Sequence, residues 1–286
     1  MIPFSARTHP GLRRSKNEDN FETDADLGLW IVADGVGGHS NGEVASEIAC
    51  TTIREQVAKG SDLRSAIENA HQAVLREIDT RDAGNNMGTT VVALQLRGDS
   101  YEIAWVGDSR AYLFDGGLKQ LTRDHSAVND LIDSGAISKA QAAIHPQRHA
   151  LSRSLGVSST NASSVSVIKG KLGAGEQILL CSDGLTDELA DTTIIAELTR
   201  NADLESQVDA LVSAALASGG RDNLTLVLLG SPRQKPRSQK EAAPDLEVTQ
   251  NIAARLAPET AGRRKTERIT LLLFVLVCII LGATLI

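Results

Sequence analysis

The sequence predicts an α+β fold in which helices cover antiparallel β-sheet. Residues 29–33 are a short run of aliphatic and aromatic residues, typical of a strand that is buried on both faces. After residue 88, strand-like segments follow one another with tight turns between them, which indicates antiparallel pairing. Two further stretches carry apolar residues three and four positions apart, and we expect them to form helices that cover the sheet.

The expected elements can be placed along the chain. The turn at His9-Pro10-Gly11 leads into a charged loop, residues 13–19. One helix is expected to begin at Ser40 or Asn41 and a second at Ser61-Asp62, because these residues can cap a helix. Residues 126–156 have an irregular helical pattern and are interpreted as an insertion between strands. The expected strands are residues 29–33, 88–96, 101–106, 111–114, 164–167, 177–181 and 224–229, and a helix over residues 208–216 precedes the last one.

Composition is that of a globular protein that does not bind nucleic acid. Of the 286 residues, 42% are hydrophobic and 23% are charged. Residues 1–230 contain 20 basic and 31 acidic residues, a net charge of −11, and such a surface repels a phosphate backbone. The three cysteines have neither disulfide nor metal-ligand spacing, which suits a reducing compartment. The N-terminus lacks the apolar segment of a secretory signal.

Acidic residues flank the expected strands in a repeated pattern. Four lie at strand ends and two lie in the charged loop: Asp34, Asp108, Asp183 and Asp222, and Glu18 and Asp19. If the strands are neighbours, these carboxylates converge and repel one another unless they are protonated or neutralised by cations. Oxygen ligands without histidine or thiolate at ligand spacing favour Mg²⁺ or Mn²⁺ over zinc. Any one acid alone fits a turn or a helix cap equally well, so the metal hypothesis rests on the set.

Seven short motifs follow one another between residues 5 and 230. They are Arg14-x-x-Asn17-Glu18-Asp19, Ala33-Asp34-Gly35-Val36-Gly37-Gly38-His39, Gly88-Thr89-Thr90, Val106-Gly107-Asp108-Ser109-Arg110, Leu121-Thr122-Arg123-Asp124-His125-Ser126, Ser182-Asp183-Gly184-Leu185 and Arg221-Asp222-Asn223-Leu224-Thr225. In this order they resemble the metal-dependent PP2C-type protein serine/threonine phosphatases, in their bacterial form. One motif alone would be a weak signal, whereas seven in order are specific.

The resemblance implies a four-layer α-β-β-α sandwich, in which two antiparallel sheets are flanked by helices and a two-metal site lies at one edge. It implies that phosphoserine and phosphothreonine proteins are hydrolysed by direct attack of a metal-bridging water, with Mn²⁺ or Mg²⁺ as cofactor. The implied domains are residues 1–230, with a flap at about residues 126–156 beside the substrate cleft. A bacterial serine/threonine kinase and its targets are the implied partners.

The same resemblance assigns the site residues one by one. Asp34 would bridge the two metals and the Gly35 carbonyl would bind the second. Asp183 and Asp222 would hold the first metal, and Glu18 would act through a bound water. Two further residues complete the expected site: Asp108, which with Asp183 matches a third metal position, and Arg14, which matches the phosphate-binding arginine.

One position departs from the eukaryotic members of that family. Many of these carry a histidine directly after the Asp-Gly pair, proposed as the acid that protonates the leaving oxygen, and this chain has Val36 there. His39, three residues further on, and His125 are more readily explained as structural residues. Protonation of the leaving group therefore has no assigned residue.

The C-terminal part of the chain predicts a membrane anchor. Residues 231–268 are rich in Pro, Lys, Arg, Glu and Ala and are expected to form a flexible, basic linker. Residues 269–286 contain no charged side chain, and as a helix they would reach about 27 Å, close to the thickness of a bilayer core. Basic residues at 263–268 flank this span, which predicts a single-pass protein of the cell (inner) membrane with a cytoplasmic catalytic domain.

Two other functions are alternatives, and each would require a sequence feature that can be checked. A phosphatase-fold scaffold or regulator with little activity would be expected to lack a ligand acid, and none is missing. A phosphatase that forms an aspartyl-phosphate would need an Asp-x-Asp motif after the first buried strand, where this chain has Asp34-Gly35-Val36.

Overall fold

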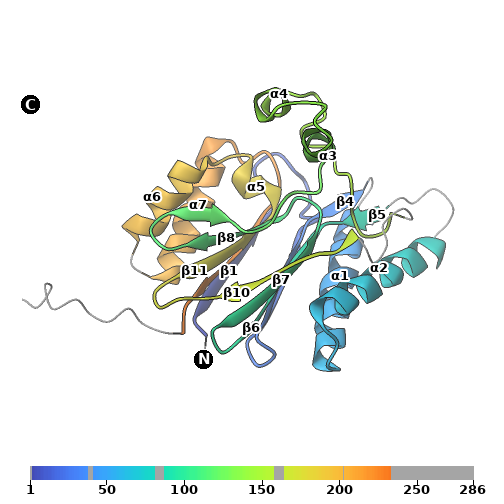
Figure 1. Ribbon diagram of the computed structural model, residues 1–286, viewed down its shortest axis with the longest axis horizontal. Helices are drawn as coiled ribbons and strands as arrows, with labels where there is room; N and C mark the ends of the chain where they lie inside the picture. Colours follow the sequence, from blue (N-terminus) through green and yellow to red (C-terminus); the bar gives the residue numbers. More distant parts are fainter. Residues whose placement is uncertain (1, 38–40, 81–86, 158–163, 202, 233–286) are drawn as a thin grey trace, which may run out of the picture. The chain divides into compact units, whose positions relative to one another are not determined.

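The computed structural model describes residues 2–37, 41–80, 87–157, 164–201 and 203–232, which lie in one compact unit (Figure 1). Two five-stranded sheets form its centre, and every strand pair in them is antiparallel. The first sheet has the order β10 (Ser166–Lys171), β7 (Ser100–Val106), β6 (Val91–Arg97), β3 (Leu29–Ala33) and β2 (Asn20–Asp24). The second has the order β1 (Phe4–His9), β12 (Leu224–Gly230), β11 (Gln177–Cys181), β8 (Arg110–Phe114) and β9 (Leu118–Gln120). A short pair, β4 (Gly35–Gly37) and β5 (Met87–Thr89), lies beside them.

Strand β3 is buried on both faces, as its composition predicts. Because side chains alternate along a strand, Ile31 packs toward the helices whereas Trp30 and Val32 pack toward the other sheet. In the cluster between the two sheets, Trp30 and Val32 pack with Ile178 and Val227 of the second sheet. All five residues of β3 are fully buried, so this strand lies at the centre of the unit.

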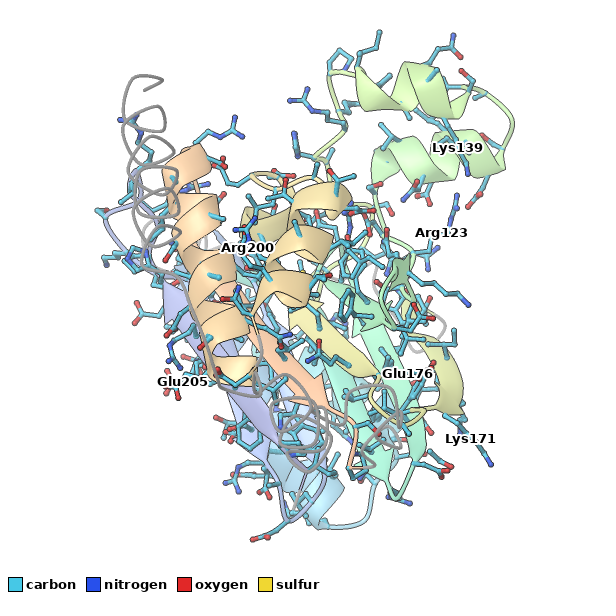
Figure 2. All side chains as sticks on the ribbon, turned by 90° about the vertical axis from the view of Figure 1, so that its left-hand side faces the viewer. Arg123, Lys139, Lys171, Glu176, Arg200 and Glu205 are labelled. Atoms are coloured by element: carbon cyan, nitrogen blue, oxygen red, sulfur yellow. The ribbon has the colours of Figure 1, made fainter. Side chains whose placement is uncertain are left out.

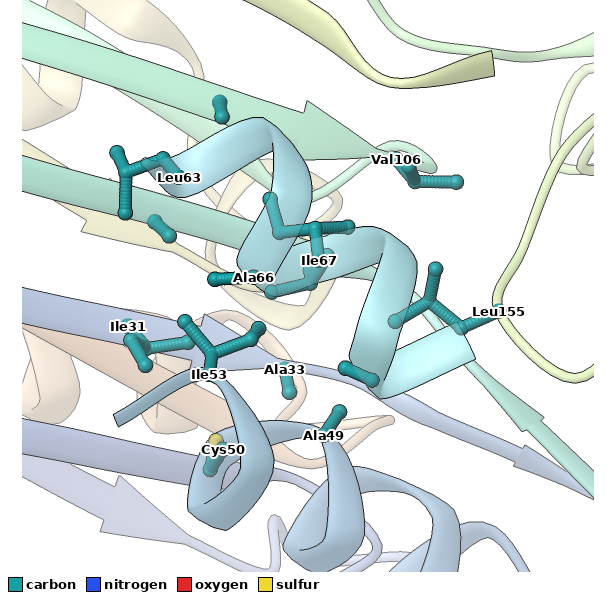
Figure 3. Close-up of a cluster of buried hydrophobic side chains, with 14 of the residues drawn as sticks. Ile31, Ala33, Ala49, Cys50, Ile53, Leu63, Ala66, Ile67, Val106 and Leu155 are labelled. Carbon is teal, nitrogen blue, oxygen red and sulfur yellow. The ribbon is translucent and has the colours of Figure 1, made fainter. Parts of the chain in front are cut away.

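Helices cover the outer face of each sheet. The pair α1 (Asn41–Ala58) and α2 (Leu63–Thr80) packs on the first sheet, where Ile53 and Ile67 meet Ile31 (Figure 3). The pair α6 (Asp191–Arg200) and α7 (Leu204–Ser218) packs on the second sheet through Ile194 and Leu211. Figure 1 shows the sheets between these two helix pairs. The predicted α+β fold of two antiparallel sheets flanked by helices is confirmed.

Several elements differ from the sequence-based expectation. The expected strand 88–96 is divided at Thr90 into β5 and β6, because Thr90 bonds to Asp34 instead of continuing one ladder. Strand β1 was not expected, since Phe4–His9 has no apolar run. It is an edge strand that pairs with β12 on one side only, so tertiary pairing overrides its weak propensity. The strands β2 and β9 and the helix α6 were not expected either.

The predicted insertion at residues 126–156 forms two short helices, α3 (Ala127–Asp133) and α4 (Lys139–Ala143). Ser126 caps α3, and Ser138 caps α4 in a capping box with Gln141. An isolated bridge between Thr89 of β5 and Leu155 joins the insertion to the short β4–β5 pair, and a second bridge, between Ser126 and Leu151, connects the two ends of the insertion. We call residues 126–156 the flap.

Three expectations fall outside the described residues. They are His39, most of the linker at 231–268 and the membrane span at 269–286. Within residues 2–37, 41–80, 87–157, 164–201 and 203–232, no helix is long and apolar enough to cross a membrane.

Candidate metal centre

The strand ends that carry the acidic residues meet at one edge of the two sheets. Strands β3 and β7 both lie antiparallel to β6, so they run in the same direction and end at the same edge, just before Asp34 and Asp108. In the second sheet the end of β11 lies beside the start of β12, which places Asp183 near Asp222. The antiparallel topology therefore brings carboxylates from both sheets together.

The charged loop reaches the same edge through backbone contacts. The Gly35 amide donates to the Glu18 carbonyl (3.2 Å), and the Ser46 hydroxyl of α1 donates to that carbonyl as well (2.7 Å). The Glu18 amide in turn donates to the Asn223 side-chain oxygen (2.8 Å) at the start of β12. Glu18 is thus fixed between the two sheets.

All the site residues that the sequence predicts line one cavity of about 210 Å³. They are Arg14, Glu18, Asp34, Gly35, Asp108, Asp183 and Asp222. Val36 and His149 also line it, and Val36 is 36% exposed there. The structure brings the predicted residues together, while their individual roles stay predictions.

Several carboxylates of this cavity have raised pKa values. Burial, aided by neighbouring negative charges, raises the pKa of Asp108 to about 7 and the pKa of Asp183 to about 6. The pKa of Asp34 is raised well above its ordinary value, first by burial and then by the charges of Asp19, Asp183 and Asp108. A side-chain hydrogen bond between Asp34 and Asp183 also acts to raise the pKa of Asp34 and to lower the pKa of Asp183.

Arg14 provides positive charge at this edge. Its guanidinium lies 2.6 Å from an Asp222 oxygen, and more than half of its side chain is exposed. The hydrogen bond to Asp222, and the charges of Asp222, Glu18 and Asp183, raise the pKa of Arg14. The guanidinium is therefore always charged and can reach a ligand from the solvent side.

A divalent cation of the Mg²⁺ or Mn²⁺ type fits the chemistry of these donors. All of them are oxygens, and their mutual repulsion is the electrostatic condition that a hard cation relieves. In the part of the chain that the structure describes, no three or more His, Cys, Asp or Glu side chains are arranged to hold a metal ion as they stand. Asp222 turns to Arg14 and Asp34 turns to Asp183 instead.

A buried polar network adjoins the cavity, which Asn223 lines and Asp19 does not. Asp19 belonged to the predicted set of acids, whereas Ser182, Thr225 and Asn223 were not predicted as site residues. Ser182 donates to an Asp19 carboxylate oxygen (2.8 Å), and the Thr225 amide donates to the Ser182 hydroxyl (3.0 Å). Burial raises the pKa of Asp19 to about 7. The Asn223 amide group donates to the carbonyls of Pro10 (2.9 Å) and Lys16 (2.8 Å). Asp19, Ser182 and Asn223 all lie within the seven motifs, and this was the sequence signal that could have marked them as part of the site.

His149 also belongs to this region without a sequence signal. It lies in the flap, lines the cavity, and its Nδ1 is 3.3 Å from an Asp187 oxygen just after the short helix α5 (Asp183–Thr186). A single histidine in an irregular segment has no spacing that would have marked it.

Gly184 allows the two halves of the site in the second sheet to approach each other. A Cβ added at this residue would overlap the backbone carbonyl oxygen of Asn223. Any side chain at position 184 must therefore push Asp183 away from Asp222.

We expect Gly184→Ala to lower both stability and metal affinity. Overpacking of this kind costs about 1–3 kcal/mol, which calorimetric or urea unfolding would measure. Displacement of Asp183 should weaken Mn²⁺ binding in titration calorimetry. The control is Gly117→Ala, since a Cβ at Gly117 would meet only Asp115 at an ordinary 3.6 Å. Equal effects of the two substitutions would contradict the role of Gly184.

The family model for protein phosphatase 2C matches residues 13–228. The serine/threonine phosphatase stp of Listeria monocytogenes is 35% identical over 237 residues, which cover 78% of this chain and 93% of that protein. A crystal structure of the catalytic domain of the serine/threonine protein phosphatase PstP, in complex with two manganese ions, superposes with a TM-score of 0.70. It is 31% identical and covers 80% of this chain and 97% of that one.

The serine/threonine protein phosphatase PstP of Mycobacterium tuberculosis is 34% identical over 235 residues. The match covers 80% of this chain but 45% of that relative, so the chain spans less than half of its length. The ordered motifs, the two antiparallel sheets with their helices and the match over residues 13–228 lead to one conclusion. The chain belongs to the protein phosphatase 2C family.

Proposed function

We propose that this protein is a metal-dependent phosphatase that removes phosphate from phosphoserine and phosphothreonine proteins. The observation that supports this best is the single cavity in which Arg14 lies beside carboxylates from both sheets. The related proteins compared above are serine/threonine phosphatases, and one of them binds two manganese ions. The substrates are phosphoproteins of the kind that a bacterial serine/threonine kinase produces.

Each residue of the cavity has a separate task in this proposal. Asp34, Asp183 and Asp222, with the Gly35 carbonyl and Glu18, would hold two Mn²⁺ or Mg²⁺ ions, and Asp108 with Asp183 would hold a third. When bound, these ions supply activation of water and neutralisation of phosphate charge. Arg14 binds the phosphate oxygens through its planar guanidinium and orients the ester. Neither Cys50 nor Cys181, the cysteines of the described residues, takes part, since both are buried in the hydrophobic clusters.

The alternative is a scaffold of the same fold with little activity. Nothing in the cavity favours it, because every predicted ligand position holds an oxygen donor. It would become the better explanation if the metal-loaded protein bound phosphopeptides without hydrolysing them.

We expect Asp183→Asn and Asp222→Asn to lower kcat/KM by at least about 100-fold, because each removes a charged ligand from a site of hard oxygens. Hydrolysis of a phosphothreonine peptide with Mn²⁺, and after removal of metal with a chelator, would measure this. Thermal unfolding with and without Mn²⁺ adds a readout besides activity, because a ligand that binds only the native state raises Tm.

The control for these two variants is Asp115→Asn. Asp115 lies in a turn where its side chain accepts from the Gly117 amide, and the Asn oxygen can still accept that bond. Wild-type activity in Asp183→Asn or Asp222→Asn would contradict the site assignment.

Arg14→Ala should act on the substrate and not on the metal. Loss of a charged hydrogen-bond donor to phosphate should lower kcat/KM for the phosphopeptide by about 10- to 100-fold. Metal affinity should stay the same or rise, because Asp222 loses the partner that holds it at 2.6 Å. Arg13→Ala is the matched control, since Arg13 is exposed and does not line the cavity. A large loss of Mn²⁺ affinity in Arg14→Ala would show that Arg14 is a structural residue.

We further propose that residues 269–286 anchor the protein in the cell (inner) membrane, with the phosphatase domain in the cytoplasm. The uncharged run and the basic flank at 263–268 support this topology. The domains then correspond to the phosphatase unit at residues 1–230, the linker at 231–268 and the span at 269–286.

Truncation after Pro232 should move the protein from the membrane fraction to the soluble fraction with its activity intact. This end point keeps Ser231, whose amide donates to the Glu176 carbonyl (2.9 Å). Val277→Arg in the full chain is a second variant, because a central arginine opposes insertion by about 2.5–3.5 kcal/mol. Membrane sedimentation of the truncated protein would refute the anchor. Digestion of the catalytic domain by protease outside intact spheroplasts would refute the orientation.

A further inference from the structure

A second, larger cavity lies directly beside the candidate metal centre. Its volume is about 620 Å³, which is within the usual range of ligand pockets. The flap forms one wall through Val128, Ile132 and Ala142, and α5 with the loop that follows it forms the opposite wall. We call this cavity the flap cleft.

The flap cleft and the metal cavity are continuous. Asp108, Asp183, Asp222 and His149 line both of them. A phosphorylated side chain held beside Arg14 therefore brings the neighbouring residues of its own chain to the entrance of the flap cleft. Those neighbouring residues of the substrate therefore face the charged side chains that line the cleft.

Most charged side chains of the cleft away from the metal cavity are paired with each other. Arg110 lies 2.7 Å from Asp124, and the Arg221 Nε lies 2.9 Å from Glu188. His149 lies 3.3 Å from Asp187. The two arginine pairs cancel in charge, and the histidine is held against an acid, so none of these groups is free to bind a substrate charge.

Two cationic side chains of the cleft are not paired in this way. Lys139 is the first residue of α4 and Arg148 lies further along the flap, and both are exposed. Neither side chain has a hydrogen-bond or ion-pair partner within the described residues. Figure 2 shows Lys139 on the flap, well away from Lys171 at the end of β10.

We propose that Arg148 and Lys139 select phosphoproteins that carry acidic residues next to the phosphorylated residue. This inference rests on the proposed phosphatase function and adds the substrate class to it. An acidic side chain that enters the cleft meets two cations whose charge is not already neutralised. A basic side chain in the same place is repelled by both cations, so acidic flanking residues are preferred over basic ones.

The size of the effect follows from the exposure of the two cations. An exposed ion pair is worth up to about 1 kcal/mol, so one well-placed glutamate should raise kcat/KM by about 3- to 5-fold, mainly through KM. The gain should shrink in high salt, because exposed charges are screened. The value of kcat depends on the metal cavity and should therefore change less than KM.

The experiment compares phosphothreonine peptides that differ in one flanking charge. A parent peptide has glutamine on both sides of the phosphothreonine, and each variant carries one glutamate within about four positions, since an extended residue spans about 3.5 Å. A parallel set carries lysine at the same positions. kcat and KM are measured separately with Mn²⁺, at low and at high salt.

The protein variants are Lys139→Gln with Arg148→Gln, and Lys139→Glu with Arg148→Glu. The neutral pair should reduce the glutamate-to-glutamine ratio of kcat/KM to about one, and the acidic pair should shift the preference to lysine. Lys171→Glu is the matched control, because it makes the same charge change far from the cleft and should keep the wild-type ratio. Equal Tm values establish that the exposed substitutions leave the fold intact.

Each outcome is decisive. If the wild-type protein hydrolyses no peptide with Mn²⁺, the proposed phosphatase function fails. If it hydrolyses the parent peptide but shows no glutamate preference at any position, the function stands and the inference about the flap cleft is wrong. A preference that survives both double substitutions also overturns the inference, as does loss of the preference in Lys171→Glu.

Discussion

Repulsion between carboxylates at one edge of the sandwich is the constraint on which the rest of the site depends. Asp34 and Asp108 come from one sheet and Asp183 and Asp222 from the other, so the site exists only while the two sheets stay in register. Burial, and after it the neighbouring negative charges, raises the pKa of Asp34, Asp108 and Asp183, as expected where carboxylates converge away from water. A fold that holds such groups together must supply stability from elsewhere, and this one does so in the apolar cluster between the sheets.

Polar contacts at this edge of the two sheets hold the site residues in place. Asn223, at the start of β12, accepts from the Glu18 amide and donates to two carbonyls of the loop that precedes β2. Asp19 enters the same region and is held by Ser182 after β11. Backbone groups of the loop between β1 and β2 are therefore held by the Asn223 side chain, and the Asp19 carboxylate is held by Ser182. Such a network positions the carboxylates more narrowly than hydrophobic packing alone, because hydrogen bonds are directional.

The sequence predicted the buried strands and the acidic residues but not the weaker elements. β3 and β11 were predicted with their observed bounds, because a fully buried strand has a continuous apolar run. β1 and β2 are edge strands with mixed composition, and only their partners define them. In the site, the seven motifs marked every predicted ligand. His149 could not be found in this way, since its position depends on how the flap folds back on α5.

The metal edge and the flap differ in how readily their side chains can be substituted. The metal edge is built from strand ends and glycines whose backbones touch, so a change at Gly184 or Gly35 moves a ligand. The flap is built from two short helices, each capped by its own serine, and one isolated bridge, between Leu155 and Thr89, joins it to β5. Side chains such as Lys139 and Arg148 can change there without disturbing a buried contact, because they are exposed. A rigid edge and a substitutable flap allow the preference for a substrate to change while the chemistry at the metal edge is retained.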